Sequence, residues 1–348
     1  MTRLILDPHW RTMDELFSPK ARDHLARFEV VWGQDAPIPA DVLNDALPQA
    51  DVLVAANPVV TQDTLARAPN LRAVIEVSGA FPDTIDYAAC AARGVEVLSC
   101  SPGFRSAVAE MGLAMTLAAS RGLVREHEAF RTGAERWLDD CTRTDFTLFG
   151  AALGFVGFGQ IGQEMARVLA PFSPRISVFD PWLPDAVVRD FAVRSTDLMA
   201  LAATSQVLYV TAVPTADNAG LISAEVLAAM PDHAVLVILS RAHLVDFDAV
   251  IAEAASGRLT VATDVFASEP LDTAHVLRAL PGVVLSPHRA AAVRGGRHLI
   301  GDLILRDLTA IAQRDPTRHL AVASPDTIAR LAGVGDAAAV ADMAATRS

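Results

Sequence analysis

Residues 153–162 read LGFVGFGQIG, an apolar run that ends in glycines at positions 157, 159 and 162. The spacing is G-x-G-x-x-G, and here it lies between a predicted strand and a predicted helix. Glycines at these positions permit a tight turn, a close approach of the backbone to a pyrophosphate, and close packing of the helix against the strand. The stretch therefore predicts the start of a unit that binds a dinucleotide.

An acidic residue closes the next predicted strand. Residues 175–180 read RISVFD, and Asp180 follows Gly162 by 18 residues. A carboxylate at this place accepts hydrogen bonds from both ribose hydroxyls and repels a 2′-phosphate. We therefore expect NAD, rather than NADP, as the cofactor. The alternative is that the glycines only shape a turn and Asp180 only caps a helix, but strand, turn, helix and acid occurring together disfavour it.

Short apolar runs alternate with helical patterns on both sides of this motif, which predicts parallel sheets with crossover helices. A helical stretch that begins near Ser106 separates two such series, and an amphipathic helix is predicted over about residues 294–313. The predicted strands of the first series are RLILD near residue 3, FEVVW near 28, ADVLVAA near 50, LRAVIEV near 71 and VEVLS near 95. Those of the second series are LGFVGF, RISVFD, VLYVTAV, AVLVILS, TVATDVF and VVLSP.

Length and composition indicate a globular protein of two domains. The chain has 348 residues, more than one ordinary core needs, and 52% of them are hydrophobic against 20% charged. Lys and Arg number 29 against 41 Asp and Glu, so the net charge of −12 repels phosphate backbones and anionic headgroups. We expect no nucleic acid and no membrane surface among the partners.

The N-terminal segment and the cysteines favour a cytoplasmic protein. The segment MTRLILDPHW holds only a short apolar run, broken by Asp7 and Pro8, so we expect no signal peptide. Cys90, Cys100 and Cys141 lack paired metal-ligand spacing, which favours reduced thiols and predicts no metal site.

Three later segments each place a polar group at the C-terminal end of a predicted strand, where open α/β sheets bind ligands. They are Ser240-Arg241, Asp264 with Glu269, and Pro287-His288. A guanidinium can hold a carboxylate and polarise a carbonyl, and an imidazole can move a proton. Beside a nicotinamide site, this set predicts hydride transfer at a carbon that bears oxygen. Taken singly, a strand-end Arg is usually a surface ion pair, and Glu269 before Pro270 could simply end a turn.

These segments resemble the signatures of the D-isomer-specific 2-hydroxyacid dehydrogenase family. The resemblance covers roughly residues 50–313 and is more specific than the glycine motif alone. The matching segments are VLVILSRAHLVDFDAV (235–250), TDVFASEPL (263–271), VVLSPHRAA (283–291) and VSGAFPDTIDYAACAARGVEVLSCSPG (77–103).

The resemblance implies a role for each matching residue. Arg241 would bind the carboxylate and carbonyl oxygens of the substrate, His288 would be the general acid and base, and Glu269 would hold and charge the imidazole. The backbone of Ser78, Gly79 and Ala80 would receive the substrate carboxylate. The implied cofactor-binding residues are Gly157, Gly159, Gln160, Ile161, Gly162, Asp180, Val213, Pro214, Asn218, Ser240, Asp264 and His288.

The same resemblance implies an α/β fold of two doubly wound parallel-sheet domains, in which a Rossmann cofactor domain is inserted in a flavodoxin-like substrate domain. We expect the substrate domain over residues 1–103 and 291–320, the dinucleotide-binding domain over 104–290, and a C-terminal tail over 321–348. A homodimer formed through the cofactor domains is also implied.

The expected activity is an NAD-dependent 2-hydroxyacid dehydrogenase similar to glyoxylate and hydroxypyruvate reductases. The alternative is an NAD(H)-sensing regulatory protein of the same fold, similar to the C-terminal-binding corepressors, which keep a similar triad. Some positions depart from the family pattern: Ala242 replaces the usual Gly after the arginine, and Arg105 stands where Asn is common. Phosphoglycerate dehydrogenases carry basic residues where Ala55, Ala56 and Asn57 stand here, so we expect an unphosphorylated substrate.

Overall fold

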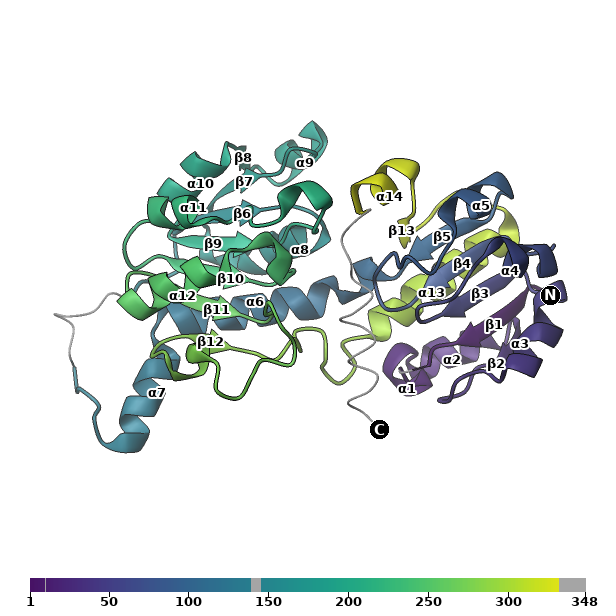
Figure 1. Cartoon of the computed structure of the whole chain (residues 1–348), viewed down its shortest axis with the longest axis horizontal. Helices are drawn as coiled ribbons and strands as arrows, with labels where there is room; N and C mark the ends of the chain where they lie inside the picture. The colour runs from purple at the N-terminus through teal and green to yellow at the C-terminus, as the bar shows by residue number, and fades with distance from the viewer. Residues whose placement is uncertain (10, 139–144, 332–348) are drawn as a thin grey trace. The chain divides into compact units, whose positions relative to one another are not determined.

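The computed structural model describes residues 1–9, 11–138 and 145–331, and Cys141 lies outside this part of the chain. It divides into two compact units, each with its own sheet (Figure 1). The first unit comprises Met1–Arg105 and Ala291–Ser348, and the second comprises Ser106–Ala290. The second unit is therefore inserted into the sequence of the first.

The first unit is built on a six-stranded sheet. Its strands are β1 (Arg3–Asp7), β2 (Glu29–Trp32), β3 (Val52–Ala55), β4 (Ala73–Glu76), β5 (Glu96–Ser99) and β13 (Ala321–Val322). They lie in the order β13-β5-β4-β3-β1-β2, in which β1 to β5 are parallel and β13 is antiparallel to β5. The order 2-1-3-4-5 is that of flavodoxin-like sheets, and it confirms the fold expected for this unit.

Helices cover both faces of this sheet because the strands are apolar on both sides. On one face Ile300 and Ile304 pack with Leu4, and on the other Leu65 packs with Val74. The helices are α1 (Met13–Leu16), α2 (Pro19–Leu25), α3 (Ala40–Ala46), α4 (Gln62–Arg67), α5 (Tyr87–Ala92), α13 (His298–Gln313) and α14 (Pro325–Leu331), with short 3₁₀ helices η1 (Leu47–Gln49) and η2 (Ser101–Phe104).

The second unit is built on a seven-stranded parallel sheet. Its strands are β6 (Ala152–Val156), β7 (Arg175–Phe179), β8 (Arg194–Ser195), β9 (Val207–Val210), β10 (Val235–Ile238), β11 (Thr260–Thr263) and β12 (Val284–Leu285). The order β12-β11-β10-β9-β6-β7-β8 is the Rossmann order 3-2-1-4-5-6 with one further strand at its end, as expected. Strand order reverses between β6 and β9, and ligands of such sheets bind at the carboxyl ends of the strands beside this switch point.

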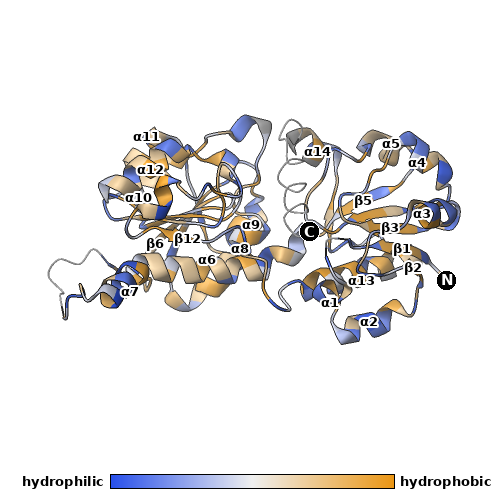
Figure 2. Cartoon of the chain, turned by 60° about the horizontal axis from the view of Figure 1, so that its bottom comes forward, coloured by the Kyte–Doolittle hydropathy of each residue, from blue (hydrophilic) through white to orange (hydrophobic). Residues whose placement is uncertain are grey.

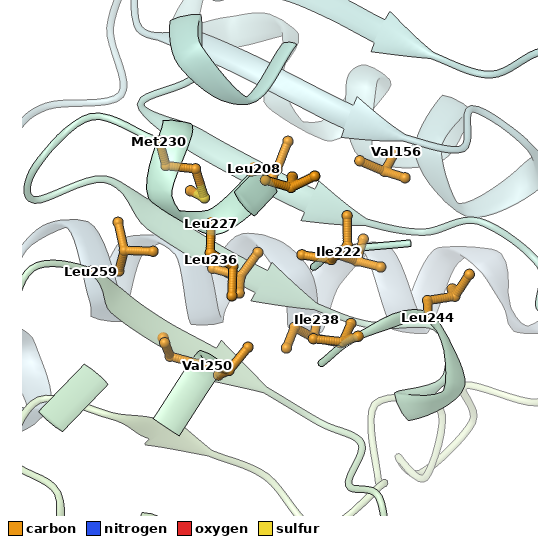
Figure 3. Close-up of a cluster of buried hydrophobic side chains, with 14 of the residues drawn as sticks. Val156, Leu208, Ile222, Leu227, Met230, Leu236, Ile238, Leu244, Val250 and Leu259 are labelled. Atoms are coloured by element: carbon orange, nitrogen blue, oxygen red, sulfur yellow. The ribbon is translucent and has the colours of Figure 1, made fainter. Parts of the chain in front are cut away.

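The core of the second unit lies between the sheet and its helices (Figure 3). Val156, Leu208, Leu236 and Ile238 from the central strands are fully buried there. The helices are α6 (Arg105–Ser120), α7 (Leu123–Thr132), α8 (Gln160–Leu169), α9 (Asp185–Asp190), α10 (Leu198–Thr204), α11 (Ala224–Ala229) and α12 (Phe247–Ser256), with 3₁₀ helices η3 (Ala170–Phe172), η4 (Ala216–Asn218), η5 (Ala242–Leu244) and η6 (Val276–Ala279).

The structure contains elements that the sequence pattern did not predict. Strand β8 has only two residues, both exposed, so it carries no apolar signal. Strand β13 and helix α14 fall within residues 321–348, where the sequence predicted a C-terminal tail, and β13 adds an edge strand to the first unit's sheet. A two-residue strand is stabilised by the neighbour with which it pairs, which a local pattern cannot show.

No single helix of the described residues is both long and apolar enough to cross a bilayer. The segments Ser101–Ser120 and Leu123–Thr132 reach that length and composition only as a pair, with a bend of 59° between them.

Candidate active site

The loop between β6 and α8 requires glycine at its first motif position. Gly157 has φ +82°, and a Cβ there would lie 2.3 Å from the Cα of Ala212, at the end of β9. Gly162, on α8, is also confined, since its Cβ would lie 3.0 Å from the carbonyl oxygen of Gly157. The two outer glycines therefore let the loop turn and let α8 pack closely against it.

The middle glycine has different surroundings. A Cβ on Gly159 would meet no atom within 4 Å, so the backbone here borders open space. Gly159 is the N-cap of the ten-residue helix α8, and the helix N-terminus favours an anion. Gln160 and Ile161 are the first two residues of that helix. This loop fits the pyrophosphate of a dinucleotide.

Asp180 lies beside the glycine loop, at the end of β7. Its Oδ2 accepts a hydrogen bond of 2.8 Å from the N–H of Phe158, and its Oδ1 accepts one of 3.0 Å from the N–H of Trp182. These bonds fix the carboxylate next to the loop and use one acceptor position of each oxygen. The remaining lone pairs could accept ribose hydroxyls.

The loops after β9 and β10 complete the cofactor side of the unit. The hydroxyl oxygen of Ser240 is buried and has no hydrogen-bond partner among the described residues. Buried hydroxyls of this kind favour a bound polar group. The side chain of Asn218 instead bonds its own loop, accepting from the N–H of Thr215 at 2.8 Å and donating to the carbonyl of Val213 at 2.9 Å. Val213 itself is exposed, and Pro214 is buried.

Three adjacent strands position the predicted catalytic side chains. Arg241 follows β10, Glu269 follows β11 and His288 follows β12, and these strands are neighbours in the sheet. His288 Nδ1 lies 2.6 Å from Glu269 Oε2, and both side chains are partly exposed, at 32% and 24%. His288 has φ +49°, a left-handed conformation that is uncommon away from glycine. The sequence-predicted acid and imidazole are therefore in direct contact.

Glu269 is held as a carboxylate. Its second oxygen, Oε1, accepts a hydrogen bond of 2.8 Å from the N–H of Phe266. Burial raises the pKa of Glu269, but the hydrogen bond and charge of His288, the Phe266 N–H and the charge of Arg241 outweigh burial, so the pKa is lowered. Arg241 also donates from Nη1 to the carbonyl oxygen of Ser240 at 2.9 Å. An ionised Glu269 is suited to stabilise a protonated imidazole.

Asp264 supports the loop that carries the histidine. It is 1% exposed and accepts hydrogen bonds from the Ser286 hydroxyl and from the N–H groups of Arg289 at 3.0 Å and Ala290 at 2.9 Å. These bonds fix the backbone on both sides of His288. A role for Asp264 in binding the cofactor stays a prediction.

In the first unit, the loop predicted to bind the substrate carboxylate has an internal partner. The N–H groups of Ser78, Gly79 and Ala80 all donate to the carboxylate of Glu76, at 2.7, 2.9 and 3.0 Å. Sequence reasoning missed Glu76. Its signal was an acidic residue closing the otherwise apolar strand AVIE just before the predicted substrate loop.

Comparisons with known proteins agree with this arrangement. Residues 113–290 match the family model "D-isomer specific 2-hydroxyacid dehydrogenase, NAD binding domain". The crystal structure of a phosphoglycerate oxidoreductase from Rhizobium etli superposes with a TM-score of 0.83 at 32% identity, covering 93% of this chain and 99% of that one.

Curated relatives carry related names. D-3-phosphoglycerate dehydrogenase of Mycobacterium bovis is 34% identical over 270 residues, which is 76% of this chain and 49% of that protein. Hydroxypyruvate reductase of Thermotoga maritima is 30% identical over 265 residues, 75% of this chain and 84% of that protein. The chain thus spans about half the length of the first curated relatives it matches. With the ordered signatures and both sheet topologies, these matches show that the chain belongs to the D-isomer specific 2-hydroxyacid dehydrogenase family and contains its NAD binding domain.

Proposed function

We propose that this protein is an NAD-dependent oxidoreductase that interconverts a small 2-hydroxy acid and the corresponding 2-keto acid. The observation that carries the proposal is the His288–Glu269 pair of 2.6 Å, with Arg241 on the neighbouring strand of the same sheet. A proton carrier, a carboxylate that charges it and a fixed cation are the groups that carbonyl reduction requires.

The cofactor fits the second unit, where Gly159 borders open space and the buried Ser240 hydroxyl has no partner among the described residues. When bound, NAD supplies or accepts the hydride. Asp180 would hold the adenosine ribose, and the turn from Gly157 to Gly162 would hold the pyrophosphate. These residues bind and orient the dinucleotide at the end of the sheet that also bears the catalytic side chains.

Arg241 would bind the substrate through its carboxylate and polarise the carbonyl that is reduced. A guanidinium presents several N–H donors in a plane, which suits two oxygens at once. Its charge also helps to keep Glu269 ionised. The same side chain therefore positions the substrate and supports the acid–base pair.

His288 would transfer the proton. Since Nδ1 is engaged by Glu269, Nε2 is the nitrogen left for the substrate oxygen. In reduction, protonated His288 donates to the oxygen that becomes the hydroxyl; in oxidation, neutral His288 accepts that proton. Glu269 stabilises the charged ring in either direction and fixes its orientation.

The substrate that we propose is unphosphorylated. Among the relatives, one is named for hydroxypyruvate and another for phosphoglycerate. Ala55, Ala56 and Asn57 here offer no charge to a phosphate in this loop. Glyoxylate, pyruvate and hydroxypyruvate are therefore the first substrates to try.

The decisive experiment follows NADH oxidation with glyoxylate, pyruvate, hydroxypyruvate and longer 2-keto acids. Turnover with one of them is expected. Absence of turnover with all of them, alongside firm NADH binding, would instead favour a regulatory protein that senses NAD(H).

The proposed assembly is a homodimer formed through the second unit. No residue of α7 is buried. The apolar side chains of Leu123 and Phe130 are each 61% exposed, and they lie seven positions apart, on one face of that helix. Trp137 extends this face, with its ring 6.2 Å from that of Phe130. In Figure 2, the ribbon of α7 carries both hydrophobic and hydrophilic residues. An apolar face of this kind is suited to a second copy of the chain.

We propose the cytoplasm as the compartment. Cys90 and Cys100 are free and buried, and burial raises the pKa of both thiols. Protonated, buried thiols are unreactive small core residues, in keeping with a reducing environment.

A further inference from the structure

Glu76 ends β4 with a fully buried carboxylate, at 0% exposure. Its Oε1 accepts from the N–H groups of Ser78 at 2.7 Å and Asn57 at 3.3 Å, and its Oε2 accepts from Gly79 at 2.9 Å and Ala80 at 3.0 Å. The carboxylate thus joins the loop after β3 to the loop after β4. Four N–H donors around one anion form a nest of the kind that binds carboxylate ligands.

The geometry matches an ionised side chain. Each oxygen of Glu76 accepts hydrogen bonds from two backbone N–H groups, an arrangement that favours the ionised carboxylate. The pKa of Glu76 is nevertheless raised, because burial outweighs the hydrogen bonds from Ser78, Asn57 and Ala80. The charge of Glu76 also reaches its neighbours, since after burial it is the main cause that raises the pKa values of Tyr87 and Cys100.

We propose that Glu76 is a positioning residue that sets substrate specificity, because its carboxylate takes the place that a substrate carboxylate would occupy on Ser78, Gly79 and Ala80. The loop is then held in its binding shape before substrate arrives. Its three N–H groups already donate to Glu76. The specificity part of this inference rests on the proposed function; the internal occupation of the nest does not.

A second consequence concerns the charge of the substrate. The loops that Glu76 joins include Asn57, whose side chain is uncharged. An ionised Glu76 between these loops would repel a second anionic group on a substrate bound beside them. The preferred substrates are therefore acids with a single negative charge.

The first test removes the carboxylate that the four N–H groups bind. In Glu76→Ala, the four N–H groups lose their partner, and the melting temperature should fall by at least about 5 °C, as expected for loss of a buried hydrogen-bonded charge. Sodium formate at tens of millimolar should restore most of this loss, because formate supplies the missing carboxylate. Formamide, of similar size but neutral, should not.

Glu76→Gln is the matched control, because its amide fills the same space without a charge and offers only one acceptor oxygen. Its melting temperature should also fall, and formate should not restore it. The inference is overturned if formate fails to stabilise Glu76→Ala, or if formamide stabilises it equally well. These readings need no turnover, so they are independent of the proposed activity.

A second measurement covers the case in which Glu76→Ala does not fold in any buffer. Amide hydrogen exchange of Ser78, Gly79 and Ala80 should be at least tenfold faster in Glu76→Gln than in the wild type, while exchange in β1 is unchanged. Equal exchange in the two proteins would show that Glu76 does not hold the loop.

The specificity arm compares hydroxypyruvate with its 3-phosphorylated form. The wild type should prefer hydroxypyruvate in kcat/KM, and Glu76→Gln should narrow that preference at least fivefold, since a negative charge is removed. If Glu76 were purely structural, its substitution would lower kcat/KM for both substrates by the same factor. An unchanged ratio would therefore contradict the charge effect even if the melting data support the nest.

Discussion

His288 Nδ1 and Glu269 Oε2 lie 2.6 Å apart at the ends of neighbouring strands, and this contact ties the proton carrier to a carboxylate that stays ionised. The pKa of Glu269 is lowered, since the contributions of His288, Phe266 and Arg241 outweigh burial. A lowered pKa means that the ionised carboxylate stabilises the folded unit at neutral pH. That contribution is lost as the pH falls through the pKa of folded Glu269.

Glu269→Gln should change the pH dependence of catalysis as well as its rate. The amide keeps the shape but no longer favours a protonated imidazole, so the alkaline fall of reductive kcat/KM should move to lower pH. At neutral pH we expect a loss of about 10²-fold in reductive kcat/KM. Glu225→Gln, an exposed change on α11, should reproduce the wild-type profile. Coincident profiles for Glu269→Gln and the wild type would show that Glu269 does not tune His288.

Arg241→Lys and Arg241→Gln should both impair use of the keto acid while leaving the cofactor site intact. A single ammonium cannot reproduce the planar donors of guanidinium, so even the lysine variant should lose about 10²-fold in kcat/KM. NADH affinity, measured by fluorescence titration, should stay within about twofold in both variants. Arg278→Gln removes an exposed guanidinium that bonds only carbonyls of its own loop, and serves as the control. Full activity of Arg241→Lys would point to another carboxylate ligand.

Substitutions at Gly157 and Gly159 should have different effects: the first should lower the stability of the fold, and the second should weaken NADH binding. Gly157→Ala introduces a Cβ 2.3 Å from Ala212 at φ +82°, so unfolding free energy should fall by at least about 2 kcal/mol. Gly159→Ala places its Cβ in open space, so its melting temperature should match the wild type. Its NADH dissociation constant should nevertheless rise about tenfold, because the methyl group obstructs the pyrophosphate. If Gly159→Ala binds NADH with wild-type affinity, the pyrophosphate does not bind at this loop.

Asp180 should make the enzyme prefer NADH over NADPH by more than about tenfold in kcat/KM, because its carboxylate repels a 2′-phosphate. Asp180→Asn retains an acceptor for the N–H of Phe158 but loses the negative charge. The ratio of kcat/KM for NADH to that for NADPH should therefore fall severalfold. Asp190→Asn, at the end of α9, is the charge-matched control and should leave the preference unchanged. If the wild type uses both cofactors equally, Asp180 does not contact the adenosine ribose.

The exposed apolar face of α7 should control assembly. Phe130→Glu combined with Trp137→Ser places polar groups at the proposed interface, and light scattering at micromolar concentration should shift from dimer to monomer. Val276→Glu changes another exposed apolar residue of the second unit and should leave the mass unchanged. A wild type that is already monomeric would end the proposal of a homodimer.

Sequence reasoning located the long strands well because their signal is local. β3 and β10 are apolar at every position, as expected for strands covered on both faces, and the glycine motif marks the turn after β6. The contact between Glu269 and His288 was also expected, from the resemblance to the dehydrogenase family. Strand β13 was not, because its pairing with β5 joins residues far apart in the chain.

The role of Glu76 shows the other limit of a linear pattern. The family resemblance implies that the backbone of Ser78, Gly79 and Ala80 receives a carboxylate, but it does not show whether the chain itself supplies one. That depends on the direction of one side chain after the strand has formed. The residues in this contact lie only two to four positions apart in the sequence, but the contact can be seen only in the folded structure.

The inserted position of the second unit has a consequence for synthesis on the ribosome. The first unit cannot be completed until α13 emerges: Arg72 donates to the carbonyl of Ile311, 239 residues later, and Ile300 and Ile304 fill the core beside Leu4. The second unit, Ser106–Ala290, is continuous and can form as soon as its own residues have left the exit tunnel. We therefore expect the second unit, the nucleotide-binding module, to fold first in the nascent chain. The N-terminal strands should complete their packing only after α13 has been synthesised.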